Sequence, residues 1–420
     1  MRPGPHIAIW LIAATSIGGV IARPWKLPEA LWAVLGAVAL IVFSLIPAGD
    51  AWLAIRKGTD VYLFLTGMMV LAELARQEGL FAWLAAAAVK RARGSASALF
   101  TLVYLVGTMV TIVLSNDATA VVLTPAVFAA TQQAKAPPMP YLFICAFIAN
   151  AASFVLPISN PANLVVYGTQ MPSLWPWLLQ FGVASLVSIV VTYAVLRFTQ
   201  RSALRAAIAV DCKLPVLSKG GHFAAAGIAI TAVTLLTASS LDWQLGLPTF
   251  LAGIGTAGAI FLLTRKSPRR LLQDISWSVL ALVAGLFVLV QGVEGTGVLT
   301  PLAQFLPASA QAHASVTALL LGSVAAFLCN VMNNLPLGLI AGSLATSAHV
   351  AALPKGALLI GVDLGPNLSV TGSLATILWL VALRREGLEV SAWRFLVLGS
   401  LVMPPALLAT LASLIWLTHG

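Results

Sequence analysis

The chain has 420 residues, of which 60% are hydrophobic and only 9% are charged. Soluble domains carry about 25% charged residues, so this composition excludes an ordinary soluble fold, which would lack a polar surface. The net charge of +10 does not indicate a nucleic-acid partner, because the basic residues lie in short loops between apolar runs.

Apolar runs long enough to cross a membrane recur along the whole chain. They predict spanning helices at 7–22, 28–46, 58–75, 141–170, 173–196, 222–240, 246–264, 275–293, 357–380 and 393–416. The first run lacks the small-residue cleavage site of a signal peptide, so we expect it to be retained as a helix.

Two further apolar stretches, 97–133 and 314–350, are each interrupted near the middle by a short polar motif. These motifs are Ser115-Asn116-Asp117 and Asn333-Asn334. Each arm has about 16–18 residues, which is short for a full crossing by the ~20-residue rule. We therefore predict two re-entrant helical hairpins within an all-α polytopic membrane fold that has about ten spanning helices.

Lys and Arg residues orient the predicted helices, because short cytoplasmic loops are enriched in them. If the loop after the third span is cytoplasmic, only Arg2, Arg56, Lys57 and Lys355 of the 23 Lys and Arg residues lie on the outer side. The pattern predicts a multi-pass protein of the inner (cytoplasmic) membrane with both termini on the outer side.

The two halves of the chain resemble each other at an offset of about 217 residues: Asn116-Asp117 is echoed by Asn333-Asn334, and Ser173-Leu174-Trp175 by Ser391-Ala392-Trp393. In the predicted topology the first copy begins inside and the second outside, which is the inverted-repeat plan of many secondary transporters. The predicted domains are an additional N-terminal helix (1–27), repeat 1 (28–200, with hairpin 97–133 and broken helix 141–170), a cytoplasmic loop and linker helix (201–245) and repeat 2 (246–420, with hairpin 314–350 and broken helix 357–380).

Four polar clusters interrupt the apolar runs and supply the candidate binding residues. Irregular backbone at membrane depth must line a cavity or be buried in protein, and its free polar groups can face a ligand. The candidate substrate-binding residues are Asn116, Asn160, Asn163, Asn333, Asn334, Asn367, Thr371 and Ser373. For each residue alone, the alternative is a hydrogen bond between packed helices. Four clusters at related positions favour a binding site.

Asp117 and Asp363 are the two carboxylates predicted to lie deep in the hydrocarbon region. Burial disfavours the charged form of a carboxylate, which makes both residues candidates for proton coupling. The alternative is that backbone N–H groups or a nearby cation neutralise them and that they only hold a hairpin tip.

The remaining chemistry is sparse. Cys145 and Cys329 lie near the polar clusters, and thiols suit soft metalloids, but a free Cys is more often a small buried hydrophobe. Cys212 falls in a predicted cytoplasmic loop. The sequence contains no Walker A pattern, HExxH motif or metal-ligand spacing, so we expect no cofactor, no metal, no enzyme activity and no ATP site in the chain itself.

The motifs resemble those of the arsenical pump membrane proteins, the ArsB family of the ion transporter superfamily. The matching motifs are Ser115-Asn116-Asp117 through Leu123-Thr124-Pro125, Ser159-Asn160 with Asn163, Met332-Asn333-Asn334 with Pro336, and Asp363-Leu364-Gly365-Pro366 with Gly372-Ser373-Leu374-Ala375-Thr376. The resemblance runs over nearly the whole chain. It implies export of trivalent arsenite and antimonite, driven by proton antiport or by a soluble arsenite-stimulated ATPase. It also implies that Asn116, Asp117, Asn333 and Asp363 carry transport.

Other functions stay open. A sodium/proton antiporter of the same superfamily would want a concentrated carboxylate site, and the second tip, Asn333-Asn334, has no acid. A dicarboxylate importer would want cationic or Thr-rich sites, and the pocket motifs contain no Lys or Arg. A membrane scaffold subunit would not need four polar breaks. Family members often carry Lys after the Asp-Leu-Gly-Pro motif, whereas this chain has Asn367, which leaves the coupling ion open.

Overall fold

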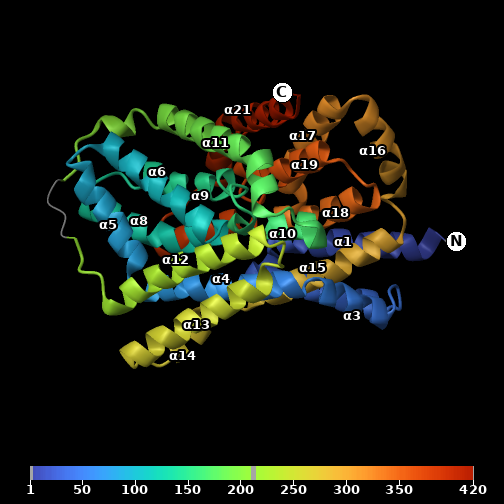
Figure 1. The fold of residues 1–420 in the computed structure, drawn as a ribbon, viewed down its shortest axis with the longest axis horizontal. Helices are drawn as coiled ribbons and strands as arrows, with labels where there is room; N and C mark the ends of the chain where they lie inside the picture. Colours follow the sequence, from blue (N-terminus) through green and yellow to red (C-terminus); the bar gives the residue numbers. More distant parts are fainter. Residues whose placement is uncertain (1–2, 210–213, 420) are drawn as a thin grey trace.

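The computed structural model describes residues 3–209 and 214–419, and every regular element in these ranges is helical (Figure 1). The helices of the first half are α1 (Pro3–Ala22), α2 (Glu29–Val42), α3 (Ala48–Lys57), α4 (Thr59–Gln77), α5 (Leu80–Ala92), α6 (Ala96–Val113), α7 (Asn116–Ala118), α8 (Thr124–Gln133), α9 (Met139–Ala151), α10 (Pro161–Tyr167) and α11 (Leu174–Thr199). The helices of the second half are α12 (Lys219–Ser240), α13 (Gly246–Thr264), α14 (Arg269–Asp274), α15 (Ser278–Gly295), α16 (Thr300–Ala312), α17 (Ala314–Met332), α18 (Asn334–Ser347), α19 (Ala352–Leu364), α20 (Leu374–Arg385) and α21 (Ala392–His419). The predicted all-helical membrane fold is confirmed. Arg2 and Cys212 lie outside the described residues.

Seven of the described helices are long and apolar enough to cross a membrane, and the pair α3–α4, bent by 47°, raises the number to eight. Five of them, α11, α12, α13, α15 and α21, coincide with predicted spans. The other two are α6 and α17, the first arms of the predicted hairpins. Four predicted spans fall below this length: 7–22 and 28–46 correspond to the shorter helices α1 and α2, and 141–170 and 357–380 are each divided between shorter helices.

The divided spans form the centre of the protein. In α9 every residue from Pro140 to Ala151 is buried, and in α19 every residue from Leu353 to Leu364 is buried. A helix that is apolar all round and short of spanning length needs protein on every side, because its open ends would leave polar backbone groups unpaired in lipid. The two divided helices are therefore enclosed by the longer ones.

Helices of the two halves interleave rather than form separate bodies. Contacts join α4 to α13, α2 to α15, α11 to α21 and α10 to α18. Small residues allow the closest approach. A Cβ atom on Gly67 of α4 would lie only 2.3 Å from the carbonyl oxygen of Thr249 in α13, so that crossing requires glycine.

The helices of the two hairpin regions lie toward opposite ends of the molecule. In Figure 1, α5, α6 and α8 lie toward the left end, whereas α16, α17 and α18 lie toward the right end, with the N-terminus beside them. The helix predicted at 222–240 is α12, which lies between α11 and α13 in the chain.

Candidate functional site

The first polar tip follows α6. Ser115 ends the first arm and caps the short helix α7, because its Oγ accepts a hydrogen bond from the Ala118 backbone N–H at 3.2 Å. The return arm starts with a π-helical turn, Thr119–Leu123, a distortion that is frequent at functional sites. Asn116 is almost fully buried, and its Oδ1 accepts a hydrogen bond from the Asp117 backbone N–H at 2.9 Å. Within the described residues, the Asn116 amide nitrogen and the Asp117 carboxylate have no hydrogen-bond partner, so both are available to a ligand.

The second polar tip follows α17 and is held by the broken segment after α19. Asn333 has φ 72° and ψ 154°, a backbone region that is essentially restricted to glycine. Its Nδ2 donates a hydrogen bond to the Thr371 carbonyl oxygen at 3.2 Å, and its Oδ1 accepts one from the Leu335 backbone N–H at 3.4 Å. The Asn334 backbone N–H donates to the Gly372 carbonyl oxygen at 2.9 Å. The strained tip is thus fixed from several directions.

Asn163 stabilises the break between α9 and α10. Its Nδ2 lies within hydrogen-bond distance of three backbone carbonyl oxygens, those of Ser153 at 2.9 Å, Pro157 at 3.2 Å and Leu156 at 3.3 Å. These carbonyl groups belong to the irregular segment and have lost their helical partners. The amide nitrogen therefore stabilises the fold, whereas Oδ1 of Asn163 has no hydrogen-bond partner within the described residues.

The break between α19 and α20 has a similar lining of polar side chains. Ser373 caps α20 by accepting a hydrogen bond from the Thr376 backbone N–H at 3.1 Å. The Thr371 hydroxyl donates to the Asn330 carbonyl oxygen at 2.8 Å, and the Ser369 hydroxyl donates to Asn330 Oδ1 at 2.7 Å. Asn330, one turn before the second tip, thus joins that tip to the break.

The two breaks meet at the centre of the protein through hydrogen bonds between distant residues. Asn160 Nδ2 donates to Asp363 Oδ1 at 2.8 Å, and Asn150 Nδ2 donates to Asn367 Oδ1 at 3.0 Å. Asn160 also caps α10, since its Oδ1 accepts a hydrogen bond from the Ala162 backbone N–H at 3.0 Å. Asp363 is completely buried, and its second oxygen, Oδ2, has no hydrogen-bond partner within the described chain. A fully buried carboxylate with one unpaired oxygen is costly in its charged form.

The structure therefore places the predicted site residues in two connected groups. One group joins the two breaks and contains Asn160, Asp363 and Asn367, and the other forms the second tip with Asn333, Asn334 and Thr371. Ser373 and Asn163 act mainly on the backbone, as a helix cap and as a clamp.

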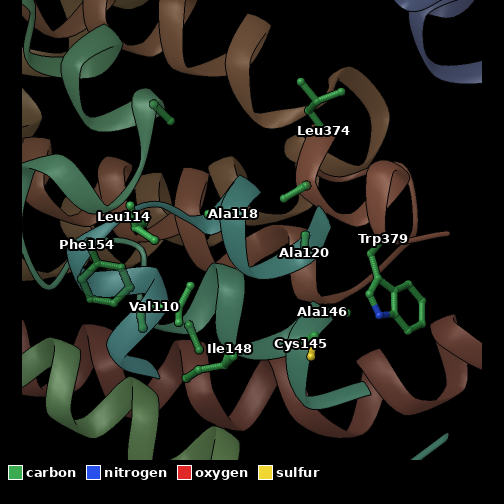
Figure 2. Packing of buried hydrophobic residues seen from close by; sticks show 14 of the residues in the cluster. Val110, Leu114, Ala118, Ala120, Cys145, Ala146, Ile148, Phe154, Leu374 and Trp379 are labelled. Carbon is green, nitrogen blue, oxygen red and sulfur yellow. The ribbon is translucent and has the colours of Figure 1, made fainter. Parts of the chain in front are cut away.

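Asn116 and Asp117 lie at the first tip, which packs against α20 of the second half. In Figure 2 Ala118 and Ala120 lie between Leu114, which is drawn beside Phe154, and Trp379 of α20, with Leu374 of α20 above them. The Trp379 indole N–H donates a hydrogen bond to the Leu142 carbonyl oxygen of α9 at 3.0 Å, so α20 contacts both the first tip and α9.

Sequence reasoning did not include Asn150 and Asn330 among the site residues. Asn150 carried a usable signal, because it precedes its partner Asn367 by 217 residues, the offset at which the two halves repeat. Asn330 carried none, because it lies inside an apolar helix and its role depends on the fold around it.

Two cavities flank the centre from opposite ends. The larger, of about 670 Å³, lies among the ends of α3, α10, α15 and α18 and includes Arg56, Lys57 and Glu294. The smaller, of about 90 Å³, contains Ser115 and Asp117 of the first tip. The short helix α10 separates them, since Pro161 lines the small cavity whereas Leu164 to Tyr167 line the large one.

The two cysteines near the site are fully buried. Cys329 Sγ lies 3.4 Å from the Val362 carbonyl oxygen, and Cys145 Sγ lies 3.9 Å from the Tyr141 carbonyl oxygen. Both thiols contact helix backbone, as expected for Cys used in packing.

Comparisons with known proteins agree with this architecture. The chain is 26% identical to the arsenical pump membrane protein of Escherichia coli K12, over 94% of this chain and 95% of that protein. It is also 26% identical to the arsenical pump membrane protein of Yersinia enterocolitica, over 97% and 95%, and 25% identical to a transporter of Mycobacterium tuberculosis, over 94% of each. The resemblance to arsenical pump membrane proteins is confirmed.

Among solved structures, the YdaH transporter of Alcanivorax borkumensis matches with a TM-score of 0.59 and 17% identity, covering 88% of each chain. The likeness is one of fold. The profile of the family described as citrate transporter (CitMHS) matches residues 9–362, which is most of the chain. The protein belongs to the CitMHS family of membrane transporters.

Proposed function

We propose that the protein is a secondary active transporter that exports trivalent arsenite and antimonite from the cytoplasm in exchange for protons. The observation that carries the proposal is the full-length similarity to arsenical pump membrane proteins, joined to a buried centre made of Asn side chains and a single carboxylate. Arsenious acid is a neutral trihydroxy solute near pH 7. Amide and hydroxyl groups suit it, since it requires no fixed counter-charge.

The proposed substrate site comprises the unpaired amide of Asn116 at the first tip, the Asn333-Asn334 tip and the central residues Asn160 and Asn367. Asp117 and Asp363 are the proposed proton-coupling residues. Asp363 supports this role because it is completely buried and has one unpaired oxygen, so that gain or loss of a proton changes its interactions strongly.

The proposed architecture is two inverted repeats with re-entrant hairpins. Corresponding helices occur in the same order: α5 and α16 have 13 residues each, α9 and α19 have 13 each, and α6 and α17 have 18 and 19. The opposite directions of the hairpins in Figure 1 support inversion. The distribution of Lys and Arg supports an inner-membrane protein with both termini outside.

Energy would come from the proton gradient, and a soluble ATPase subunit is the proposed alternative source. The sequence offers no Walker A motif, so hydrolysis of ATP by this chain is not part of the proposal.

The test is arsenite uptake into everted membrane vesicles, with and without a proton gradient. Wild type is compared with Asn116→Ala and Asp363→Asn. Gradient-dependent uptake that both substitutions abolish is the expected result. If arsenite does not accumulate and sodium instead collapses the proton gradient, the protein is an antiporter of the same superfamily.

Organic-anion transport is a second candidate, favoured by the family description and by the size of the 670 Å³ cavity, which is much larger than arsenious acid needs; its charged lining residues are Arg56, Lys57, Asp60 and Glu294. Citrate uptake into right-side-out vesicles that arsenite does not inhibit would support it over arsenite export.

A further inference from the structure

The small cavity beside the first tip has a charged mouth that the proposed site does not use. Its walls are mostly apolar and include Phe64 and Met68 of α4. Three carboxylates line it, namely Asp117 at the tip, Glu73 of α4 and Asp274 at the end of α14. The cavity thus connects an unpaired tip carboxylate with two acidic residues near the ends of their helices.

Arg76 does not itself line the cavity but joins two acidic residues that do, Glu73 and Asp274. Its Nε and one terminal nitrogen donate to the two oxygens of Glu73, at 2.8 and 2.5 Å, and the same terminal nitrogen donates to Asp274 Oδ2 at 2.7 Å. Gln77 Nε2 adds hydrogen bonds to Glu73 Oε1 at 2.7 Å and to Asp274 Oδ2 at 3.3 Å. Two-pronged Arg–carboxylate bonds fix geometry as well as add energy. These bonds hold the segment after α13 against α4.

The rest of the contact is weak enough to open. The segment held by Arg76 is the six-residue helix α14 and the turn that follows it. Leu271 of α14 and Ile275 of the turn are buried, whereas Arg269 and Arg270 are exposed. Two buried side chains give this segment a small apolar contact, so the ionic contacts contribute a large share of its attachment.

The two cavities differ in size, as expected of a transporter that is wide on one side and constricted on the other. The cavity on the side of Arg56 and Lys57 has about 670 Å³, whereas the one beside Glu73 and Asp274 has about 90 Å³. In the proposed topology the first side is external and the second cytoplasmic.

We propose that Glu73, Arg76 and Asp274 form the cytoplasmic gate of the transport pathway, that the gate is closed in this structure, and that its opening exposes Asp117 to the cytoplasm. The inference rests on the proposed transport function and topology. The gate is the place at which the solute and the coupling ion enter or leave the protein on the cytoplasmic side.

The test measures access to the cavity and does not depend on the substrate. Val121, which lines the cavity and is half-buried, is replaced by Cys in a chain whose three native cysteines are Ala. A membrane-impermeant thiol reagent is applied to everted vesicles, where the cytoplasmic face is outside. We expect Arg76→Ala to raise the labelling rate about tenfold, which corresponds to a shift of about 1.4 kcal/mol in the gating equilibrium.

Lys266→Ala is the matched control. Lys266 Nζ donates to the carboxylate of Glu78 at 2.6 Å, so this variant also removes a cation from an ion pair with a buried carboxylate, but neither residue lines the cavity. Its labelling rate should equal that of the parent. Arg76→Lys keeps the charge without the two-pronged geometry and should label at an intermediate rate, which provides a second measurement if the Ala variant does not fold.

Equal labelling of the Arg76→Ala, Lys266→Ala and parent proteins would overturn the gate. Preferential labelling in right-side-out vesicles would overturn its assignment to the cytoplasmic side. Faster labelling of Arg76→Ala in a protein that fails to move arsenite would retain the gate and reject the substrate, so the two failures are distinguishable.

Discussion

The hydrogen bond between Asn160 and Asp363 permits a quantitative test of the central site. Asn160→Ser removes the amide nitrogen that donates to Asp363 but retains an oxygen that can cap α10, because Ser and Asn are similarly good helix caps. Asp363→Ala removes the acceptor. The two single variants and the double variant form a cycle whose coupling energy isolates the pair from the separate cost of each substitution.

The size of the coupling energy reports the charge on Asp363. Hydrogen bonds to charged groups contribute about 1.5–3 kcal/mol, whereas polar pairs between membrane helices average about 0.6 kcal/mol. Asp363 is fully buried, so solvent does not screen the bond. We expect a coupling of about 2 kcal/mol at alkaline pH, where the carboxylate is ionised, and about 0.6 kcal/mol at acidic pH, where it carries a proton.

The assay is unfolding by SDS in mixed micelles, followed by tryptophan fluorescence at two pH values. Asn160→Ser combined with Gly258→Ala serves as the control, because Gly258 faces open space and the two changes should be additive within about 0.5 kcal/mol. A coupling below that limit at both pH values would refute the hydrogen bond. A coupling that is large and equal at both pH values would retain the bond and refute proton exchange at Asp363.

Three further substitutions separate folding from transport. Asn333→Gly relaxes the backbone at φ 72° and ψ 154° but removes the two hydrogen bonds of the side chain. The two effects are of similar size, so the unfolding free energy should change by less than about 1 kcal/mol while arsenite uptake is lost; unchanged uptake would show that the Asn side chain is dispensable. Gly361→Ala puts a Cβ atom 2.2 Å from the Gly322 carbonyl oxygen and should push α17 away from α19, so the yield of monodisperse protein should fall. The control Gly258→Ala should leave the yield unchanged, because Gly258 faces open space. Equal yields of the two variants would contradict the close packing of α17 and α19. Asn163→Ala leaves three carbonyl groups of the break without their amide donor and should destabilise the protein by about 2 kcal/mol. The KM of the folded fraction for arsenite should not change. A raised KM at normal stability would instead indicate that Asn163 contacts the substrate.

The sequence was informative where local chemistry decides structure. Composition alone required a membrane fold, because a chain with 9% charged residues cannot cover a soluble surface. Short polar motifs within apolar runs located the tips at Asn116 and Asn333. Polar residues beside Pro and Gly located the breaks before Pro161 and Leu374, since Pro and Gly end helices whatever their neighbours are. The number of spans was less certain, because an apolar run such as 141–170 has the composition of one crossing even when a break divides it.

Hydrophobic composition and helix-breaking residues were thus readable from the sequence by itself, because each depends on neighbours in the chain. The proposed repeat at an offset of about 217 residues rests on internal similarity of the sequence. The partners of the site residues were decided only by the tertiary structure. Asn160 meets Asp363 and Arg76 meets Asp274 across about 200 positions of the chain, and the amide nitrogen of Asn163 lies within hydrogen-bond distance of backbone carbonyl groups of the break. A hydrogen bond requires its two groups to lie about 3 Å apart, and helix packing, rather than any local pattern, sets that distance.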